Sequence, residues 1–346
     1  MVKYKNIIKK FKKARILVVG DLVLDQYIKG VVHRISPEAP VPIVLQKEAF
    51  YTPGGAANVA NNLSSLGVEV TLVGRIGDDI EGQILKKELK KRHIHTHAVF
   101  VDKRYDTIFK TRIIAQHQQV VRIDRETVTE PAEDDDFKRS VIGNFLNKYF
   151  NDFDGVIISD YGKGMIDRAL VAKIGNLSRK KKIPITADPK VEHFKFYGSV
   201  TAITPNKKEA EDALKAIPEE TRKNLGIQSV NLRSMEDIKR VGKGFLRYLG
   251  IESILITLGE QGMFLFEQDK EPFLIPTRAR EVFDVSGAGD TVISVFTLAL
   301  AASASKRQAA DIANYAAGVV VGKLGAVAVT QQELEDAIKY HASAGS

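Results

Sequence analysis

The stretch Val282–Thr291 holds two glycines and an aspartate directly before a long apolar run. Gly287 and Gly289 allow the backbone to turn tightly and to direct successive amide N–H groups to one side, where a helix begins. Such a turn favours anion binding. Asp290 follows at once, and a carboxylate beside bound anions can accept a proton. Together, the turn and the carboxylate indicate phosphoryl transfer to a hydroxyl group.

The same residues also fit an ordinary helix start. Ser286 would then be the N-cap, Gly287 the turn residue, and Asp290 a charge that complements the helix dipole. A short glycine motif does not separate the two interpretations by itself, so other positions in the chain must decide between them.

Two stretches near the N-terminus carry candidate ligand contacts. Asp21 follows the apolar run Ile16–Gly20, which is typical of a buried parallel strand. Ligands of open α/β sheets collect at the carboxyl ends of such strands, so Asp21 is either a ligand contact or a turn residue. Gly54 and Gly55 precede a small-residue helix that carries Asn58. Small residues allow close approach of a ligand or of another helix, and the Asn58 amide can both donate to and accept from a sugar hydroxyl.

In the second half of the chain helices and strands alternate, and the apolar runs end in polar residues. Three such ends are Ser159–Tyr161, Asp188–Lys190 and Thr204–Asn206. Because parallel strands end along one edge of a sheet, these residues should lie together. Glu209, one turn into the next helix, could hold a hydrated Mg²⁺ beside nucleotide phosphates or could close a capping pair. The turn from Gly259 to Gly262 would let a nucleotide lie close to the backbone.

The expected fold class is α/β, with a central, mostly parallel sheet flanked by helices. Val31–Gln46 contains three prolines around short extended pieces, which favours edge strands over a helix. Three further extended pieces follow one another without an intervening helix: 96–101, 107–115 and 119–124. We therefore predict a small β-sheet lid outside the main layer, formed by segments of approximately 28–48 and 96–124. Short connections elsewhere predict a single domain over 1–346.

Composition restricts the class of protein. With 346 residues, of which 44% are hydrophobic, the chain can bury a large core. It has no cysteine, which excludes disulfides and thiolate metal sites. Apolar runs of membrane-spanning or signal-peptide length are absent, so we expect a cytoplasmic protein without a membrane partner. The net charge of +8 is concentrated in part near the N-terminus, which fits a solvated helix or an anionic surface partner and also suits phosphate ligands.

The octapeptide Asp284–Thr291 resembles the C-terminal signature of the ribokinase-like (PfkB) carbohydrate kinases. Four further matching positions occur in the order typical of that family: Gly20 with Asp21, Gly54 and Gly55 with Asn58, Asn206 with Glu209, and Thr257 with Gly259. Five ordered matches over nearly the whole chain are far more specific than one glycine motif. The resemblance implies a ribokinase-like fold and an ATP-dependent kinase.

The resemblance also implies roles for individual residues. Asp290 would be the base that deprotonates the acceptor hydroxyl, and Asp284 would lie near a monovalent cation, expected to be K⁺. The amides of the anion hole would be those of Gly287, Ala288 and Gly289. The sugar would contact Asp21, Gly54, Gly55 and Asn58. The residues around ATP and Mg²⁺ would be Asn206, Glu209, Thr257, Gly259, Gly262 and Asn314.

Longer stretches resemble the D-glycero-β-D-manno-heptose 7-phosphate kinases of lipopolysaccharide core synthesis. They are Ile35–Pro42, Pro53–Ala60, Ser159–Gly164, Asp188–Lys190 and Gly318–Gly325. The implied acceptor is O1 of this heptose phosphate, and the implied product is the 1,7-bisphosphate. Four cations are candidates for pairing with the far phosphate, although each could equally be a surface side chain: Arg112, Arg122, Lys163 and Lys190. No histidine lies in the His-x-Gly-His motif that marks a fused nucleotidyltransferase in relatives, which predicts a single-function form or an isolated domain.

Other functions remain open. Ribokinases, adenosine kinases and 6-phosphofructokinases share this fold, so the fold alone does not select a sugar. A basic nucleic-acid-binding protein that has kept the fold is disfavoured by the intact Asp290 and its two glycines, and we expect no nucleic-acid partner. An exposed lid sheet has edges that a second copy can pair with, so we expect a homodimer, which sedimentation at micromolar concentration would test.

Overall fold

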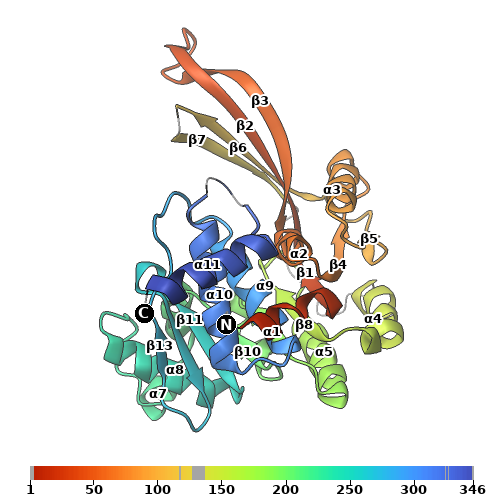
Figure 1. Cartoon of the computed structure of the whole chain (residues 1–346). Coiled ribbons are helices and arrows are strands. Elements are labelled where there is room, and N and C mark those ends of the chain that lie inside the picture. The colour runs from red at the N-terminus through yellow and green to blue at the C-terminus, as the bar shows by residue number, and fades with distance from the viewer. Residues whose placement is uncertain (1–3, 117, 127–136, 324, 326, 345–346) are drawn as a thin grey trace.

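The computed structural model describes residues 4–116, 118–126, 137–323, 325 and 327–344. A nine-stranded sheet lies in the body of the molecule, and a four-stranded sheet projects from it (Figure 1). In order of pairing, the large sheet consists of β13 (Phe273–Ile275), β12 (Met263–Glu267), β11 (Ser253–Thr257), β10 (Ala202–Ile203), β9 (Ile185–Asp188), β8 (Gly155–Ser159), β1 (Arg15–Gly20), β4 (Glu69–Ile76) and β5 (Val99–Val101).

The large sheet is parallel from β11 to β5, and β12 and β13 add an antiparallel edge. Its central strands β1 and β8 are buried along nearly their whole length, as a parallel sheet covered on both faces requires. The predicted fold class, a mostly parallel sheet flanked by helices with a smaller sheet beside it, is confirmed.

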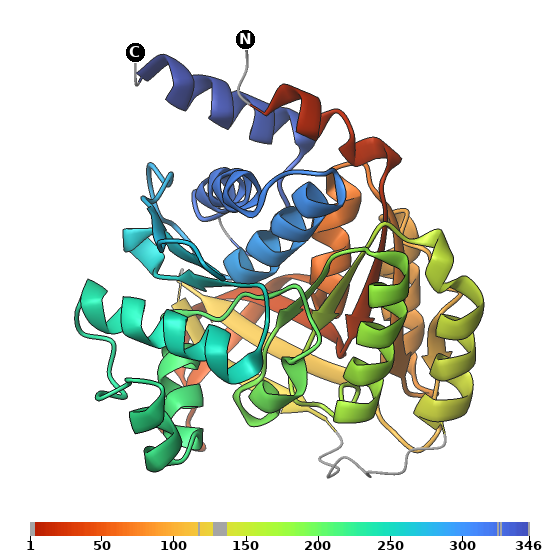
Figure 2. The same cartoon turned by 90° about the horizontal axis from the view of Figure 1, so that it is seen from below.

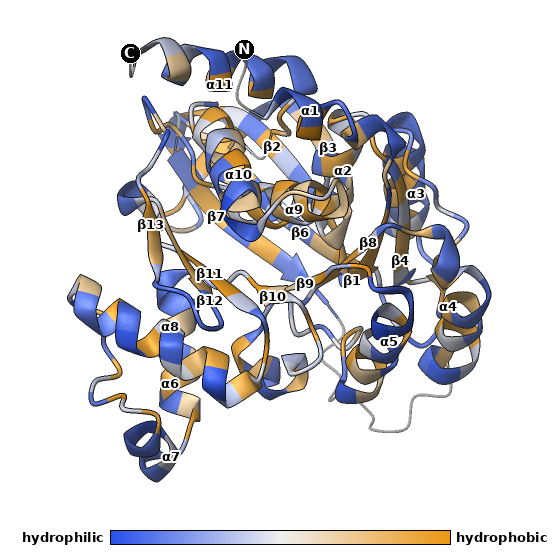
Figure 3. Ribbon diagram, turned by 60° about the horizontal axis from the view of Figure 1, so that its bottom comes forward, coloured by the Kyte–Doolittle hydropathy of each residue, from blue (hydrophilic) through white to orange (hydrophobic). Residues whose placement is uncertain are grey.

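Helices cover both faces of the large sheet and form two apolar cores with it (Figures 2 and 3). One face packs against α1 (Lys5–Ile8), η1 (Phe11–Lys13), α2 (Ala56–Ser65), α3 (Ile80–Lys91), α9 (Ala288–Ala301), α10 (Lys306–Val320) and α11 (Gln331–Ala344). The other packs against η2 (Lys138–Ile142), α4 (Gly143–Tyr149), η3 (Phe150–Asp152), α5 (Arg168–Lys181), η4 (Val191–Tyr197), α6 (Lys207–Ala216) and α8 (Met235–Leu249). The remaining short helices are α7 (Glu219–Asn224) and η5 (Gly259–Gln261). None of the described helices combines the length and the apolar character needed to cross a membrane.

Helix α9 is buried on all sides. Every residue from Asp290 to Ala299 is buried, which explains why the sequence is apolar around the whole helix and not along a single stripe. The helix begins directly after Gly287, which has a left-handed backbone with φ of 78°. Its N-terminus, and with it Asp290, lies at the carboxyl edge of the sheet, beside residues that follow β8 and β9. The fold therefore brings the predicted strand ends to the helix start.

The small sheet has the order β3 (Pro42–Gly55), β2 (Leu22–Ile35), β6 (Ile108–Ala115) and β7 (Gln118–Arg125). Strand β2 continues β1 after Asp21, so the small sheet starts inside the body and extends outward (Figure 1). It is therefore longer than the predicted segment 28–48. The segment 96–101 was wrongly assigned to this sheet, because β5 pairs with β4 in the large sheet and the apolar side chains of Ala98 and Val99 are buried in the body.

Candidate active site

Asp290 lies in the first turn of α9 with only 7% of its surface exposed. Two side chains from other elements donate hydrogen bonds to its carboxylate. Asn58 of α2 donates from Nδ2 to Oδ2 at 2.7 Å, and the hydroxyl of Tyr161 donates to Oδ1 at 3.1 Å. Each carboxylate oxygen is thus held by one donor and keeps a lone pair for a ligand hydroxyl.

Burial raises the pKa of Asp290 from its ordinary value of 3.8 to about 6. The hydrogen bonds from Asn58 and Tyr161 oppose this rise because they favour the ionised form, whereas the nearby charge of Asp25 adds to it. A carboxylate with this pKa is ionised at neutral pH and accepts a proton more readily than an exposed aspartate. These are the properties of a general base.

A cavity of about 350 Å³ opens beside Asp290, between the small sheet and the body. Its lining includes Gly54, Gly55, Asn58, Ser286 and Gly287. Five cationic side chains also line it: Lys110, Arg112, Arg122, Lys163 and Lys190. The structure therefore brings all four predicted phosphate cations to one cavity and adds Lys110.

Carboxylates hold most of these cations in place. Arg112 pairs with Asp25 at 2.6 Å, and Lys163 pairs with Glu126 at 2.6 Å. Lys110 and Arg122, on neighbouring lid strands, both pair with Asp124. For Lys190 the described part of the chain contains no ion-pair partner. The paired cations are therefore oriented toward the cavity before any ligand binds.

Gly54 and Gly55 bring their backbone close to Asp25 and Asp21. A Cβ atom on Gly54 would lie 2.3 Å from Oδ2 of Asp25, and one on Gly55, where φ is 57°, would lie 2.6 Å from the carbonyl oxygen of Asp21. Both positions therefore require glycine. The sequence analysis expected a ligand or another helix to approach these glycines, but their closest neighbours are atoms of β2 and of Asp21.

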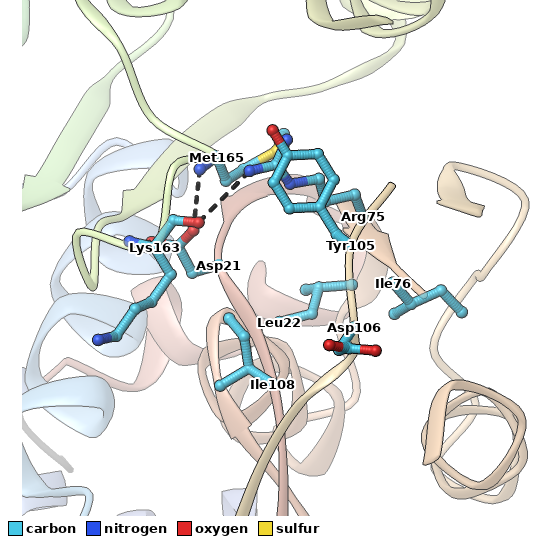
Figure 4. A pocket seen from close by; sticks show the side chains of 9 residues that line it. All are labelled: Asp21, Leu22, Arg75, Ile76, Tyr105, Asp106, Ile108, Lys163 and Met165. Atoms are coloured by element: carbon cyan, nitrogen blue, oxygen red, sulfur yellow. Dashed lines mark hydrogen bonds between the residues drawn. The ribbon is translucent and has the colours of Figure 1, made fainter. Parts of the chain in front are cut away.

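The structure directs Asp21 away from the cavity beside Asp290. Its carboxylate accepts hydrogen bonds from the backbone amides of Tyr161, Lys163 and Met165 at 2.9, 3.2 and 3.0 Å. Figure 4 shows Asp21 beside Lys163 and Met165. Asp21 lines a neighbouring cavity of about 20 Å³, which has room for about one water molecule. We therefore assign Asp21 to support of the 161–165 loop and not to the sugar contact that the sequence predicted.

Asp25 lies in the cavity beside Asp290, where the sequence analysis expected Asp21. It is 9% exposed and lines the large cavity together with Val23 and Tyr27. Alternate residues of a strand face the same side, so the positions 23, 25 and 27 on β2 could have been recognised from strand periodicity. Sequence reasoning missed Asp25 because it stopped at the first aspartate after the strand.

A second cavity, of about 180 Å³, lies on the other side of Asp290. Its lining residues are Tyr161, Asp188, Thr204, Asn206, Glu209, Thr257, Gly287, Gly289 and Asp290. The predicted nucleotide contacts Asn206, Glu209 and Thr257 thus come together here. Asp188, Thr204 and Tyr161 were noted only as strand ends and are additional members.

Two predicted nucleotide contacts have structural partners instead. Asn314 is 3% exposed and donates from Nδ2 to the carbonyl oxygen of Pro276 at 2.6 Å. Gly262 has φ of 91°, and a Cβ atom there would lie 2.1 Å from the carbonyl oxygen of Ile275. Neither residue lines the second cavity. Gly259, with φ of 61°, has open space where its Cβ would be, so a ligand can approach its backbone.

The second cavity fits a hard cation. Glu209 and Asn206 form a capping box, with Oε2 of Glu209 accepting the Asn206 amide at 2.8 Å, so the alternative capping role is present. Burial and the charges of Glu209 and Asp290 raise the pKa of Asp188 well above its ordinary value, and the buried hydroxyl of Thr204 has no hydrogen-bond partner among the described residues. A bound cation would favour the ionised form of Asp188 and would give the Thr204 hydroxyl oxygen a partner. Among the described residues no group of three or more His, Cys, Asp or Glu side chains could hold a metal, so phosphate and water oxygens would complete the shell.

The turn before α9 agrees in part with the predicted anion hole. The Ala288 amide donates to the carbonyl oxygen of Val285 at 3.2 Å, which leaves it less available than expected. The amides of Gly287 and Gly289 have no acceptor within the described parts of the chain. Asp284 accepts from the amides of Ser286 and Gly325 at 2.9 and 3.0 Å. Partial burial opposes ionisation of Asp284, but these hydrogen bonds outweigh it and lower its pKa.

The model of the pfkB family carbohydrate kinases matches residues 13–333 of the chain. The chain belongs to this family. The pfkB match confirms the predicted enzyme class, an ATP-dependent carbohydrate kinase. Among solved structures, the pfkB-family chain is similar in fold to a ribokinase from Arabidopsis thaliana complexed with ribose and ATP, with a TM-score of 0.71, 19% identity and coverage of 94% and 99% of the two chains.

A second structural relative is phosphofructokinase-2 from Escherichia coli in complex with potassium, with a TM-score of 0.73, 15% identity and coverage of 95% and 99%. Among curated proteins, "Bifunctional protein HldE" of Desulfatibacillum aliphaticivorans is 42% identical over 325 residues. That alignment covers 94% of the pfkB-family chain but only 63% of the relative. The chain thus spans slightly less than two thirds of the length of this relative.

Proposed function

We propose that this pfkB-family chain transfers the γ-phosphoryl group of ATP to a sugar phosphate. The proposed acceptor is O1 of D-glycero-β-D-manno-heptose 7-phosphate, which gives the 1,7-bisphosphate. The observation that carries the proposal is the gathering of five cations around one cavity that Asp290 also lines. A neutral sugar offers no partner for these cations, whereas a second phosphate does.

The sugar would lie with its anomeric end at Asp290 and its phosphate toward the lid. Asp25 would accept a hydrogen bond from a sugar hydroxyl, since it lines the cavity and Arg112 holds it in place. The choice of heptose rests on the resemblance of Ile35–Pro42 and Ser159–Gly164 to heptose 7-phosphate kinases, and the similarity to proteins named HldE supports it. Such a substrate would assign the enzyme to ADP-heptose and lipopolysaccharide core synthesis in the cytoplasm.

The reaction follows from the two cavities on either side of Asp290. ATP would lie along the second cavity with its γ-phosphate at the start of α9, where the amides of Gly287 and Gly289 and the helix dipole favour negative charge. The acceptor oxygen attacks the γ-phosphorus, the bond to the β,γ-bridging oxygen breaks, and ADP leaves with that electron pair. The hydroxyl proton passes to Asp290. Asn206, Glu209 and Thr257 would position the nucleotide, with the open backbone at Gly259 beside it.

Mg²⁺ would be held by Glu209 through water and by Asp188, both in the second cavity. When bound, it would neutralise part of the charge on the phosphates. The homodimer also remains a proposal, supported by exposed apolar side chains on the small sheet, namely Ile35, Leu45, Val121 and Ile123.

A panel of acceptors tests the function. We expect heptose 7-phosphate to have the highest kcat/KM when compared with unphosphorylated heptose, ribose and fructose 6-phosphate at equal concentrations. The five cavity cations should make the phosphorylated heptose better than the unphosphorylated one. Preference for ribose or fructose 6-phosphate would overturn the heptose assignment and leave another pfkB-family sugar kinase. Absence of transfer to every sugar would overturn the kinase proposal itself.

Glu209→Gln should raise the Mg²⁺ concentration needed for half-maximal activity by roughly tenfold, as loss of an outer-shell carboxylate commonly does. Glutamine keeps a carbonyl oxygen for the Asn206 amide, so the capping box and the fold should survive. The matched control is Asp212→Asn on the same helix, whose carboxylate pairs with Lys208 and Lys215 at the surface. An unchanged Mg²⁺ dependence in Glu209→Gln, or full wild-type activity in excess EDTA, would exclude this site.

K⁺ should raise the activity relative to tetramethylammonium at equal ionic strength. Asp284 supplies an ionised carboxylate beside the α9 turn, and its oxygens suit a hard cation. The potassium complex of the structurally similar phosphofructokinase-2 supports the same expectation. Equal rates with the two cations would show that no monovalent-ion site contributes.

A further inference from the structure

Tyr161 stands between the two cavities. Its side chain lines the sugar cavity and the second cavity, and its hydroxyl donates to Oδ1 of Asp290. The ring packs over Gly55, where a Cβ atom would lie 3.6 Å from Cδ2 of the tyrosine. Tyr161 is thus in contact with the reacting carboxylate, although neither the glycine signature nor the predicted phosphate cations include it.

Two buried carboxylates fix the backbone that carries Tyr161. Asp21 accepts the amides of Tyr161, Lys163 and Met165 from one side. Asp160 accepts the Gly162 amide on Oδ1 at 2.8 Å, while its Oδ2 contacts Nδ1 of His193 at 2.7 Å and the hydroxyl of Tyr197. Because the backbone is held in this way, the position of the Tyr161 hydroxyl depends only on the dihedral angles of its side chain.

Tyr161 remains a hydrogen-bond donor over the working pH range. Burial and the charges of Asp290 and Asp188 raise its pKa well above the ordinary value of 10.0, so it keeps its proton. A neutral phenol beside a carboxylate can only donate to it. Tyr161 therefore does not compete with Asp290 for the acceptor proton.

One hydrogen-bond donor is not enough to fix the orientation of the Asp290 carboxylate. Asn58 holds Oδ2, and a combined change of the two Asp290 side-chain dihedral angles would still move Oδ1 about that contact. With Tyr161 on Oδ1, both oxygens have defined positions. Small displacements of a reacting group cost about 100-fold in rate, so a second fixed point can affect turnover.

We propose that Tyr161 is a positioning residue for Asp290, holding the carboxylate in the orientation that accepts the proton of the sugar hydroxyl. This inference rests on the proposed function, in which Asp290 is the base. The ionisable groups around Asp290 are Asp25 and Tyr27 from β2, Asp188 from the end of β9, Glu209 from α6, Lys163 from the 161–165 loop and Lys190 after β9, together with the lid cations Lys110, Arg112 and Arg122. None of these hydrogen-bonds to the Asp290 carboxylate, whereas Tyr161 and Asn58 do.

Tyr161→Phe should lower kcat by about tenfold and leave the KM values for ATP and sugar phosphate little changed. It should also move the acidic limb of the kcat/KM profile to higher pH by about one unit, because a hydrogen bond to a charged group is lost and the ionised form of Asp290 becomes less stable. The change in the acidic limb is the signature that a loss of packing alone would not produce.

Tyr197→Phe is the matched control. It removes a buried hydroxyl from a different carboxylate, Asp160, which keeps the contacts from His193 and Gly162. The acidic limb should stay at the wild-type pH in this variant. A shift of equal size in both variants would overturn the inference, because it would trace the effect to the loop and not to the hydroxyl on Asp290.

A ¹³C NMR titration of the Asp290 carboxyl group separates this inference from the proposed function, since it needs no substrate. The pKa of Asp290 should be higher in Tyr161→Phe than in the wild type and unchanged in Tyr197→Phe. An unchanged Asp290 pKa in Tyr161→Phe overturns the inference. A raised KM for the sugar with an unchanged kcat also overturns it, because Tyr161 would then be a substrate contact. Failure of the wild type to phosphorylate any sugar would instead overturn the proposed function.

Discussion

Replacing Asp290 with asparagine should lower kcat by roughly 10²–10⁴-fold and leave the dissociation constant for ATP nearly unchanged. Only the proton acceptor is lost, since asparagine has the same shape and the amides of Gly287 and Gly289 at the α9 turn remain. Steady-state rates with heptose 7-phosphate measure the first effect, and calorimetric titration with a non-hydrolysable ATP analogue measures the second. If the variant keeps more than about a tenth of wild-type activity, another group accepts the proton.

The stability of the Asp290→Asn variant serves as a control for its folding. Asp290 has a folded-state pKa above its ordinary value, so its ionisation destabilises the folded protein at every pH above about 6. The Asp290→Asn substitution removes that charge and should raise the free energy of unfolding by up to about 3 kcal/mol at pH 7 to 8. The gain should shrink as the pH falls from 6 toward 4, where the wild-type carboxyl group is also neutral. Thermal unfolding at pH 4.5 and pH 7.5 tests this, and an inactive variant that is less stable at pH 7.5 would indicate misfolding.

The local chemistry of the site was predictable because it depends on short sequence patterns. The turn at Gly287, the helix start at Asp290 and the capping pair of Asn206 with Glu209 each need only a few adjacent residues. That these residues lie close together was predictable as well, since polar residues that follow parallel strands share an edge of the sheet. The second cavity, which joins Thr204, Asn206 and Thr257 to Gly289, has this origin.

What could not be predicted depends on side-chain direction in three dimensions. Strand periodicity places Asp25 beside Val23 and Tyr27, but no local pattern shows that the nearby Asp21 binds the amides of the 161–165 loop. The hydroxyl of Tyr161 meets Asp290 across 129 positions of sequence, a contact that no local pattern contains. Asn314 and Gly262 match family positions, yet their partners are backbone carbonyls of the β13 region, which only the packing of α10 and β12 reveals.

Lys190→Met should lower kcat/KM for heptose 7-phosphate by about 30- to 100-fold, mainly through KM, and should leave the low activity with unphosphorylated heptose unchanged. Lys190 lines the sugar cavity, and the described part of the chain gives it no ion pair. Removing the Lys190 ammonium therefore breaks no ion pair. Removing Arg112, in contrast, would leave Asp25 buried without its partner. A hydrogen bond between a lysine and a phosphate dianion in a closed cavity contributes on the order of 1.5–3 kcal/mol.

The two acceptors and the two enzymes form a double-mutant cycle, in which the 7-phosphate is one partner and the Lys190 ammonium the other. Lys195→Met is the control, because Lys195 lies on η4, five residues beyond Lys190, and is exposed outside the cavity. A coupling confined to Lys190 and the phosphorylated sugar would mean that the cation contacts the far phosphate. Equal losses with both acceptors would assign Lys190 to the nucleotide side, where its charge lies near Glu209. The remaining cavity cations, Lys110, Arg112, Arg122 and Lys163, would then have to bind the sugar phosphate.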